Sequence, residues 1–255
     1  MTGVERQRII DLVKREVIPA IGCTEPVAVA LCVAKATETL GKRPQHINIY
    51  LSANILKNAM GVGIPGTGMI GLPIAVALGA LVGKSDYQLE VLRDITPEAV
   101  EEGKLFIEEK RVNIALKENI DEKLYIEVCC KSGDDNAVAV IAGGHTSLVY
   151  LKRNTEILLD KKCERIGSCS STQLDLNLRK VYDFAVTAPL NEIRFILDAA
   201  RLNKAAAESS FKGDYGHGLG KMLKGTYEQK ILGDSIFSIS YLILLELAMP
   251  VWQEL

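Results

Sequence analysis

Apolar side chains recur at helical spacing near the start of the chain. They predict an amphipathic helix that ends near Pro19 and has apolar positions at Ile9, Ile10, Val13, Val17 and Ile18. A second helix is predicted from Pro26 through an almost wholly apolar segment to about Leu40, ending at Gly41. A third is predicted at the segment ITPEAVEEGKLFIEEK, where Thr96 is the cap and Pro97 is the first helical residue.

Alternating or β-rich segments predict strands at 46–52, 111–117, 124–132 and 136–153. The segment KSGDDNA, residues 131–137, is typical of a hairpin turn. These patterns therefore predict an antiparallel meander over residues 111–153, and the strand predicted at 46–52 joins the same sheet. From Leu174 onward the pattern is helical.

These elements predict an α+β fold, with a mainly antiparallel sheet, packed helices and a helical C-terminal region. We expect one unit over residues 1–255. It would have helices within 5–40, a sheet region at about 46–153 that includes a glycine-rich helix at 61–83, and a helical region over 174–250.

Composition narrows the possible partners. The formal net charge is −2 and aromatic residues make up 5% of the chain, so nothing suggests nucleic acid or an anionic membrane. The uncharged apolar segment from Met69 to Val82 suits a buried helix better than a membrane span. The first residues interleave charged and apolar side chains and lack the apolar core of a secretory signal, which predicts a cytoplasmic protein.

The six cysteines are then expected to be free thiols or ligands rather than disulfides. Cys129 and Cys130 are adjacent in a predicted strand, so they point to opposite faces and cannot chelate together. Cys163 and Cys169 have no standard zinc spacing and read as loop cysteines.

The segment IPAIGCTEPVAVAL places Cys23, Thr24 and Glu25 at the start of the second helix. The positive end of a helix dipole lowers the pKa of a thiol and favours the thiolate, so Cys23 is a candidate reactive group. The alternative is that Cys23 is a small apolar residue that fills a turn, with Glu25 as an ordinary acid in the first turn.

The glycine-rich segment KNAMGVGIPGTGMIGLPIAVALGALVGK matches G-x-G-x-x-G in two overlapping frames, which begin at Gly61 and Gly66. A nucleotide-dependent oxidoreductase would need this fingerprint directly between a strand and a helix, and eight residues separate the predicted strand from Gly61. The glycines could instead allow close packing of helices, or a loop that faces a ligand beside Lys57 and Asn58.

A second glycine-rich segment, KGDYGHGLGKMLKG, contains Asp214, His217 and Lys221. It is not a Walker loop, because Gly216 and Gly220 are separated by three residues and Met222 follows the lysine. A single loop histidine is usually an ordinary surface residue, although its neighbours here make it a candidate site residue.

Three segments together, EVIPAIGCTEPVAVAL, the glycine-rich segment and KGDYGHGLGK, resemble the L-cysteine desulfidase family, which is related to the α chain of iron–sulfur L-serine dehydratases. The resemblance is collinear to about Gly225 and covers the N-terminal part of that family's architecture. It implies a lyase with a [4Fe–4S] cluster that eliminates sulfide from L-cysteine, or water from L-serine, and leaves pyruvate and ammonia. An open iron position would act as a Lewis acid on the leaving group.

The resemblance also implies roles for individual residues. Cys23 would be a catalytic base or a cluster ligand, and His217 and Lys221 would close the site. A small amino-acid substrate would be bound by Thr24, Glu25, Asn58, Gly61, Gly63, Gly66, Thr67 and Gly68, with backbone N–H groups of the glycines suited to a carboxylate.

The chain departs from this family in one respect. The family is longer and places three cluster-ligating cysteines in its C-terminal part, whereas no cysteine follows Gly225 here. We therefore expect the isolated chain to bind no cluster and to be inactive, with a missing C-terminal half or a homo-oligomer formed through the apolar segment Ile236–Leu247. The alternative is a non-catalytic small-molecule binding or regulatory domain.

Overall fold

A computed structural model of the chain describes residues 1–161, 176–212, 221–222 and 225. Contacts group the described residues into a larger unit over 20–161 and a smaller unit formed by 1–19 with 176–212, 221–222 and 225. The single unit expected over residues 1–255 stays a prediction.

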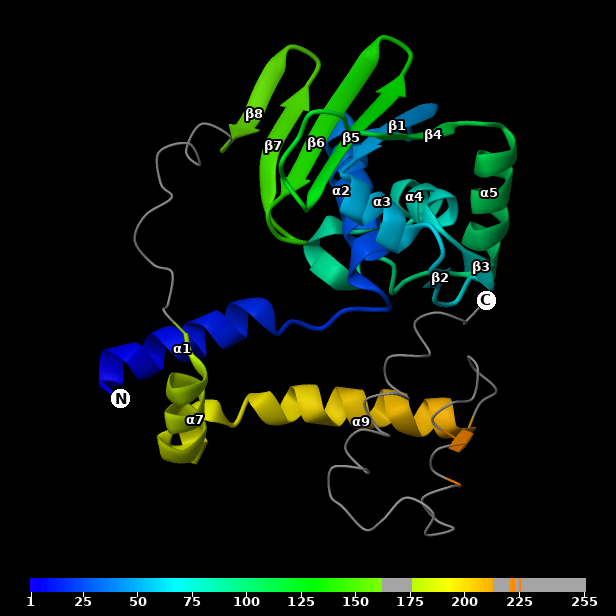
Figure 1. Cartoon of the computed structure of the whole chain (residues 1–255). Coiled ribbons are helices and arrows are strands. Elements are labelled where there is room, and N and C mark those ends of the chain that lie inside the picture. The colour runs from blue at the N-terminus through cyan, green and yellow to red at the C-terminus, as the bar shows by residue number, and fades with distance from the viewer. Residues whose placement is uncertain (162–175, 213–220, 223–224, 226–255) are drawn as a thin grey trace. The chain divides into compact units, whose positions relative to one another are not determined.

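The larger unit contains a six-stranded sheet in the order β4-β1-β5-β6-β7-β8 (Figure 1). Its strands are β1 (His46–Leu51), β4 (Val112–Leu116), β5 (Tyr125–Ser132), β6 (Asp135–Ala142), β7 (Leu148–Arg153) and β8 (Glu156–Asp160). Alternate residues of β1 are buried, as their apolar–polar alternation predicts. This sheet and its helices confirm the predicted α+β fold with a mainly antiparallel sheet.

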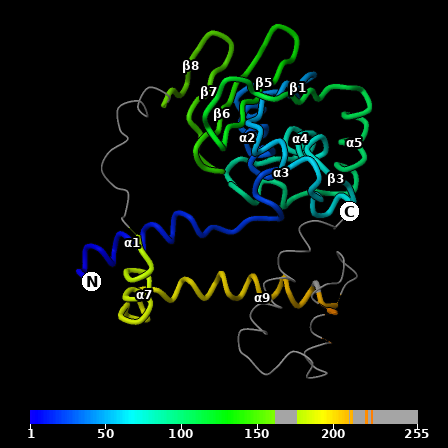
Figure 2. Tube along the Cα trace, in the orientation of Figure 1, coloured from blue at the N-terminus to red at the C-terminus, as the bar shows by residue number. Residues whose placement is uncertain are grey.

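The strand order differs from the predicted meander. Strand β1 lies between β4 and β5, and it pairs with β4 in parallel, with Ile47 opposite Val112. The consecutive antiparallel hairpins run from β5 to β8, and Figure 2 shows this part of the trace. A parallel pair needs a long crossover connection, which sequence periodicity alone does not reveal. Strand β8 was not predicted from the sequence.

Two helices form the core with the sheet. Helix α2 (Thr24–Leu40) packs against β5, β6 and β7 and also against α4 (Leu72–Leu81). Helix α2 ends at Gly41 in a left-handed conformation (φ 75°), as predicted, because glycine adopts this conformation without steric cost. Helix α5 (Pro97–Glu108) packs on α4 and begins as predicted, with the Thr96 hydroxyl accepting from the Ala99 N–H.

Helices α2 and α4 approach so closely that glycine is required at their contact. A Cβ atom on Gly79 would lie 2.7 Å from the Ala30 carbonyl oxygen and 3.0 Å from the Ala30 Cα. Both of these atoms belong to backbone, so no side-chain movement could make room. This close approach is one of the two roles that the sequence left open for the glycine-rich segment.

The predicted glycine-rich helix at 61–83 is wrong in its first half. Residues Gly63–Ile64 (β2) and Met69–Ile70 (β3) pair as a small antiparallel hairpin, and α4 begins only at Leu72. Positive φ values at Gly66 and Gly68 turn the chain between the two strands, which is incompatible with a continuous helix. The short helix α3 (Ala53–Ala59) and the 3₁₀ helix η1 (Ser85–Glu90) complete the larger unit.

The smaller unit consists of helices. Helix α1 (Gly3–Glu16) begins with a capping box between Thr2 and Glu5 and ends three residues before Pro19. The other helices are α7 (Leu178–Thr187), α8 (Leu190–Ile193) and α9 (Ile196–Lys212). They fall within the helical region predicted over 174–250, and the rest of that region lies outside the described residues.

Ile9, Ile10 and Phe184 form the buried core of this unit. The side chains of Arg6 and Glu192 form an ion pair, with 2.7 Å between Nε and Oε2, that joins α1 to α8. Within the part of the chain that the structure describes, no helix has both the length and the apolar character needed to span a bilayer.

Candidate functional site

The turn before α2 is fixed from two sides. The Ile21 N–H donates to the Leu89 carbonyl oxygen at 3.1 Å. Gly22 adopts φ +80°, and a Cβ atom there would lie 2.9 Å from Cγ of Pro65. Glycine is therefore favoured at position 22 for two reasons: the backbone has a positive φ, and Pro65 leaves no room for a side chain. The turn thus lies directly against the β2–β3 hairpin.

The Glu25 carboxylate is the centre of a hydrogen-bonded cluster at this turn. Its Oε2 accepts from the Cys23 thiol at 2.9 Å and from the Thr24 hydroxyl at 3.2 Å, and its Oε1 accepts from the Asn58 side-chain amide at 3.2 Å. Cys23 is the N-cap residue of α2, Glu25 lies in the first turn and Asn58 comes from α3. Two helices therefore position three donors around one half-buried carboxylate.

The pKa values of Glu25 and Cys23 are shifted in opposite directions at this site. Burial works to raise the pKa of Glu25, but hydrogen bonds from Cys23, its own backbone N–H, Asn58 and Thr24 outweigh burial and lower that pKa. Burial, followed by the hydrogen bond to Glu25, raises the pKa of the Cys23 thiol to about 11. The lowered thiol pKa expected from the helix dipole is therefore wrong for this site, because burial and the adjacent carboxylate both keep the proton on sulfur.

The β2–β3 hairpin beside this cluster is held by Thr67. The Thr67 hydroxyl donates to the Ile64 carbonyl oxygen at 2.6 Å and accepts from the Met69 N–H at 3.0 Å. Positions beside Gly61, Gly66 and Gly68 are open, since a Cβ atom at each would meet nothing within 4 Å. The backbone there is accessible to a small molecule.

We expect Thr67→Val to destabilise the hairpin, because it removes the hydroxyl while keeping the side-chain shape. The loss of two hydrogen bonds should lower the free energy of unfolding by about 1–3 kcal/mol, measured by urea denaturation. Thr67→Ser retains the hydroxyl and serves as the control. Equal losses in both variants would show that the methyl group, and not the hydrogen bonds, holds the turn.

The structure brings together part of the predicted site. Cys23, Thr24, Glu25 and Asn58 are linked by hydrogen bonds, and the hairpin that carries Gly63, Gly66, Thr67 and Gly68 lies against Gly22. Lys221 is described in a helical segment that groups with the smaller unit, so the structure gives no distance from it to Cys23. His217 lies outside the described residues.

Sequence reasoning missed two residues of this arrangement, Gly22 and Pro65. The signal for Gly22 was present in the order Ile-Gly-Cys, because a glycine directly before a helix cap often supplies a positive φ. The contact between Gly22 and Pro65 joins segments far apart in the chain, and no local pattern predicts it.

The described cysteines do not fit an iron–sulfur cluster. Such clusters are held by four cysteine thiolates in most proteins, and Cys23 is the one described cysteine within the candidate site. Cys32 and Cys130 are buried in the core, while Cys129 is half-buried on the opposite face of β5, as predicted. Cys163 and Cys169 lie outside the described residues. Among the described side chains, no group of three His, Cys, Asp or Glu residues could hold a metal ion.

Comparisons with known proteins identify close relatives in several bacteria. The chain is 71% identical over 238 residues to a protein of Bacteroides thetaiotaomicron, covering 93% of this chain and 56% of the relative. These relatives are named UPF0597 proteins. Others come from Porphyromonas gingivalis, 49% identical over 236 residues (90% of this chain, 54% of the relative), and Aeromonas hydrophila, 39% identical over 234 residues (91% and 53%).

The chain therefore spans about half the length of the curated UPF0597 relatives that it matches. No family model matches the chain. No solved structure matches it either.

Proposed function

We propose that this chain carries the amino-acid-binding part of a lyase that acts on L-cysteine or L-serine. The Glu25 carboxylate, with its three side-chain donors beside an open glycine hairpin, is the observation that supports this proposal. A zwitterionic amino acid needs an anionic partner for its ammonium group and hydrogen-bond donors for its carboxylate. Glu25 provides the first, and the N–H groups of the hairpin provide the second.

The proposed reaction is an α,β-elimination. The C–H bond at the α-carbon and the C–S or C–O bond at the β-carbon break, which releases sulfide or water and forms 2-aminoacrylate. This product tautomerises to an imine, and water then hydrolyses it to pyruvate and ammonia. A base must take the α-proton, and the leaving group must be stabilised.

Cys23 is the proposed base, and the cluster suggests how substrate would activate it. In the free protein, burial together with the hydrogen bond to Glu25 raises the pKa of the Cys23 thiol to about 11, so the proton stays on sulfur. An ammonium group bound at Glu25 would neutralise the carboxylate and compete for its Oε2 atom. The Cys23 pKa would then fall, and the thiolate fraction would rise when an amino acid is present.

A [4Fe–4S] cluster, which the resemblance implies, does not fit the described residues, so the proposal derives no step through one. Because the chain spans about half of its relatives, we propose that the isolated chain binds the amino acid without turning it over. Among the described cysteines Cys23 alone belongs to the site, which also favours a second candidate, a small-molecule binding domain without catalysis.

Calorimetric titration tests the binding step. We expect L-cysteine and L-serine to bind the chain, and Glu25→Gln to abolish this binding, while Glu102→Gln on the distant helix α5 leaves it unchanged. Glu102 is matched to Glu25 in charge but pairs with Arg43 at the surface. Failure of both amino acids to bind, or equal binding by the Glu25 variant, would contradict the proposed site.

Pyruvate formation separates the two candidates. The full-length Bacteroides thetaiotaomicron relative, prepared and assayed without oxygen, should convert one of the two amino acids to pyruvate, whereas this chain should not. If the relative binds amino acids with no pyruvate formed, the binding-domain alternative holds.

A further inference from the structure

Helix α7 has a second apolar face, on the side away from the core of the smaller unit. Phe184 points into that core and is 8% exposed, whereas Leu178 on the other face is 85% exposed. Val181, Tyr182 and Val186 continue the exposed face at helical spacing. A helix with apolar side chains on two faces is normally covered on both.

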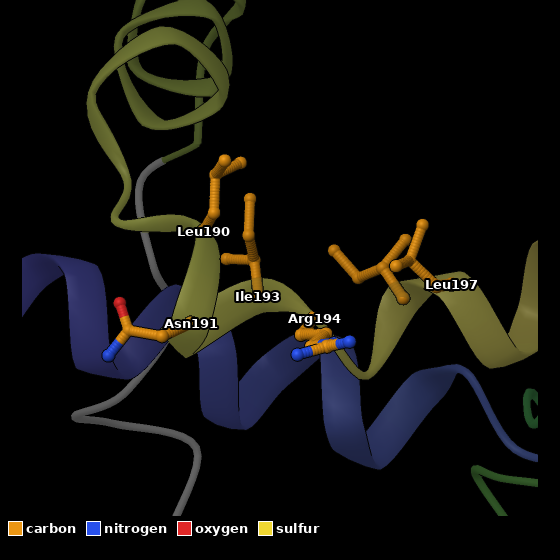
Figure 3. Close-up of a pocket in the computed structure, with 6 residues that line it drawn as sticks. Leu190, Asn191, Ile193, Arg194 and Leu197 are labelled. Carbon is orange, nitrogen blue, oxygen red and sulfur yellow. The ribbon is translucent and has the colours of Figure 1, made fainter.

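The next two elements carry further exposed apolar side chains around a hollow. Leu190, Asn191, Ile193, Arg194, Ile196 and Leu197 line a depression of about 540 Å³ between α8 and the start of α9. Figure 3 shows Leu190, Ile193 and Leu197 directed to the same side of the ribbon. Leu190 is 81% exposed and Leu197 is 64% exposed. We define the docking face as Leu178, Val181, Tyr182, Val186, Leu190, Ile193 and Leu197.

The docking face carries the signature of an interaction surface. Monomeric proteins rarely expose contiguous apolar patches of more than a few hundred Å². Arg194, one of the residues that line the hollow, is a residue type enriched at interfaces. The inner side of α8 forms an ion pair with α1 through Glu192, whereas among the described residues Leu190 on the apolar side is left exposed.

The length of the relatives indicates what that partner is. This chain covers 56% of the Bacteroides thetaiotaomicron protein and 54% of the Porphyromonas gingivalis protein, so nearly half of each lies outside the match. In a full-length protein this region is tethered, and a short flexible tether gives an effective concentration in the millimolar range. A tethered region therefore occupies an apolar face before a second copy can.

We propose that the docking face binds the region of the full-length relatives that this chain does not span, through an uncharged, predominantly apolar contact surface. This inference is independent of the proposed lyase activity. The same contact would form whether the full-length protein is an enzyme or a binding protein.

Co-expression tests the docking face. The tagged chain is produced together with the unmatched region of the Bacteroides thetaiotaomicron relative, so that each can fold against the other. We expect the tagged chain to retain that region, and the double variant Leu190→Asp, Leu197→Asp to weaken the interaction by about 30-fold or more. Leu105→Asp is the matched control, because Leu105 is a 58% exposed leucine on α5 in the larger unit.

Circular dichroism of each variant checks that its helices are intact, and a single Leu197→Ser variant replaces the double variant if the latter unfolds. The proposal is supported if the wild-type chain retains the unmatched region and only the docking-face variants retain less of it. Failure of the wild-type chain to retain the region overturns it, as does equal weakening by Leu105→Asp. Sedimentation of the chain alone tests the remaining occupant, a second copy of the chain. If the wild-type chain is a dimer, the docking-face variants are monomers and the unmatched region is not retained, the face binds a second copy and the proposal is overturned.

Discussion

Glu25→Gln is expected to make Cys23 markedly more reactive. Because the Glu25 carboxylate accepts the thiol proton, its charge opposes formation of a second negative charge on sulfur. A neutral glutamine removes this repulsion, and its amide can donate to the thiolate. The thiolate fraction at a fixed pH below the pKa rises about tenfold for each unit by which the pKa falls, so we expect about tenfold faster alkylation.

The measurement is the rate of iodoacetamide labelling of the Cys23 peptide, followed by mass spectrometry across pH. In the wild-type chain the rate should rise towards a midpoint near pH 11, and in the variant this midpoint should move to lower pH. Burial continues to act on the thiol in both proteins. Glu102→Gln removes a remote carboxylate and should leave the profile unchanged. Identical profiles for the wild-type chain and Glu25→Gln would mean that burial alone sets the Cys23 pKa.

Substitution of Gly79 should have the largest effect on stability. In an exposed helix, alanine is more favourable than glycine by about 1 kcal/mol. At Gly79 the added methyl group would meet the Ala30 backbone, so α2 and α4 would have to move apart. We expect Gly79→Ala to lower the free energy of unfolding by about 1–3 kcal/mol and Gly79→Val to prevent folding, measured by urea denaturation.

Gly103 on α5 provides the matched control. It is also a buried helical glycine, but a Cβ atom there would meet first the Cδ1 atom of Ile74 at 2.9 Å, which is the end of a flexible side chain. Gly103→Ala should therefore be neutral or stabilising by up to about 1 kcal/mol. Gly79→Ala is thus expected to destabilise the protein, and Gly103→Ala is not. A stabilised Gly79→Ala would contradict the close approach of α2 and α4.

Local signals in the sequence predicted the elements whose ends are set by their own residues. Gly41 and the Thr96–Pro97 pair mark helix ends because the left-handed cap and the N-cap hydrogen bond act within a few residues. Alternation placed the apolar residues of β1 on one face. These features do not depend on the rest of the fold.

Features that depend on distant segments could not be predicted. Glycines at 61–71 are compatible with a helix contact or a turn, and the hairpin that the first part forms packs against Gly22, far away in the sequence. The Cys23 pKa was predicted in the wrong direction because the helix dipole was considered without the burial of the thiol and without its hydrogen-bond partner. That partner, Glu25, was recognised as a site residue, but its hydrogen bond to sulfur is a matter of geometry.

The position of β1 in the sheet has a consequence for how the chain folds during synthesis. Both neighbours of β1 are made much later, since Ile47 pairs with Val112 on one side and with Cys130 on the other. At about 5–20 residues per second, several seconds pass on the ribosome before either edge of β1 can pair. The nascent chain therefore carries an apolar strand with two open edges for this time, and helix α2, made before β1, is already available to cover its apolar face.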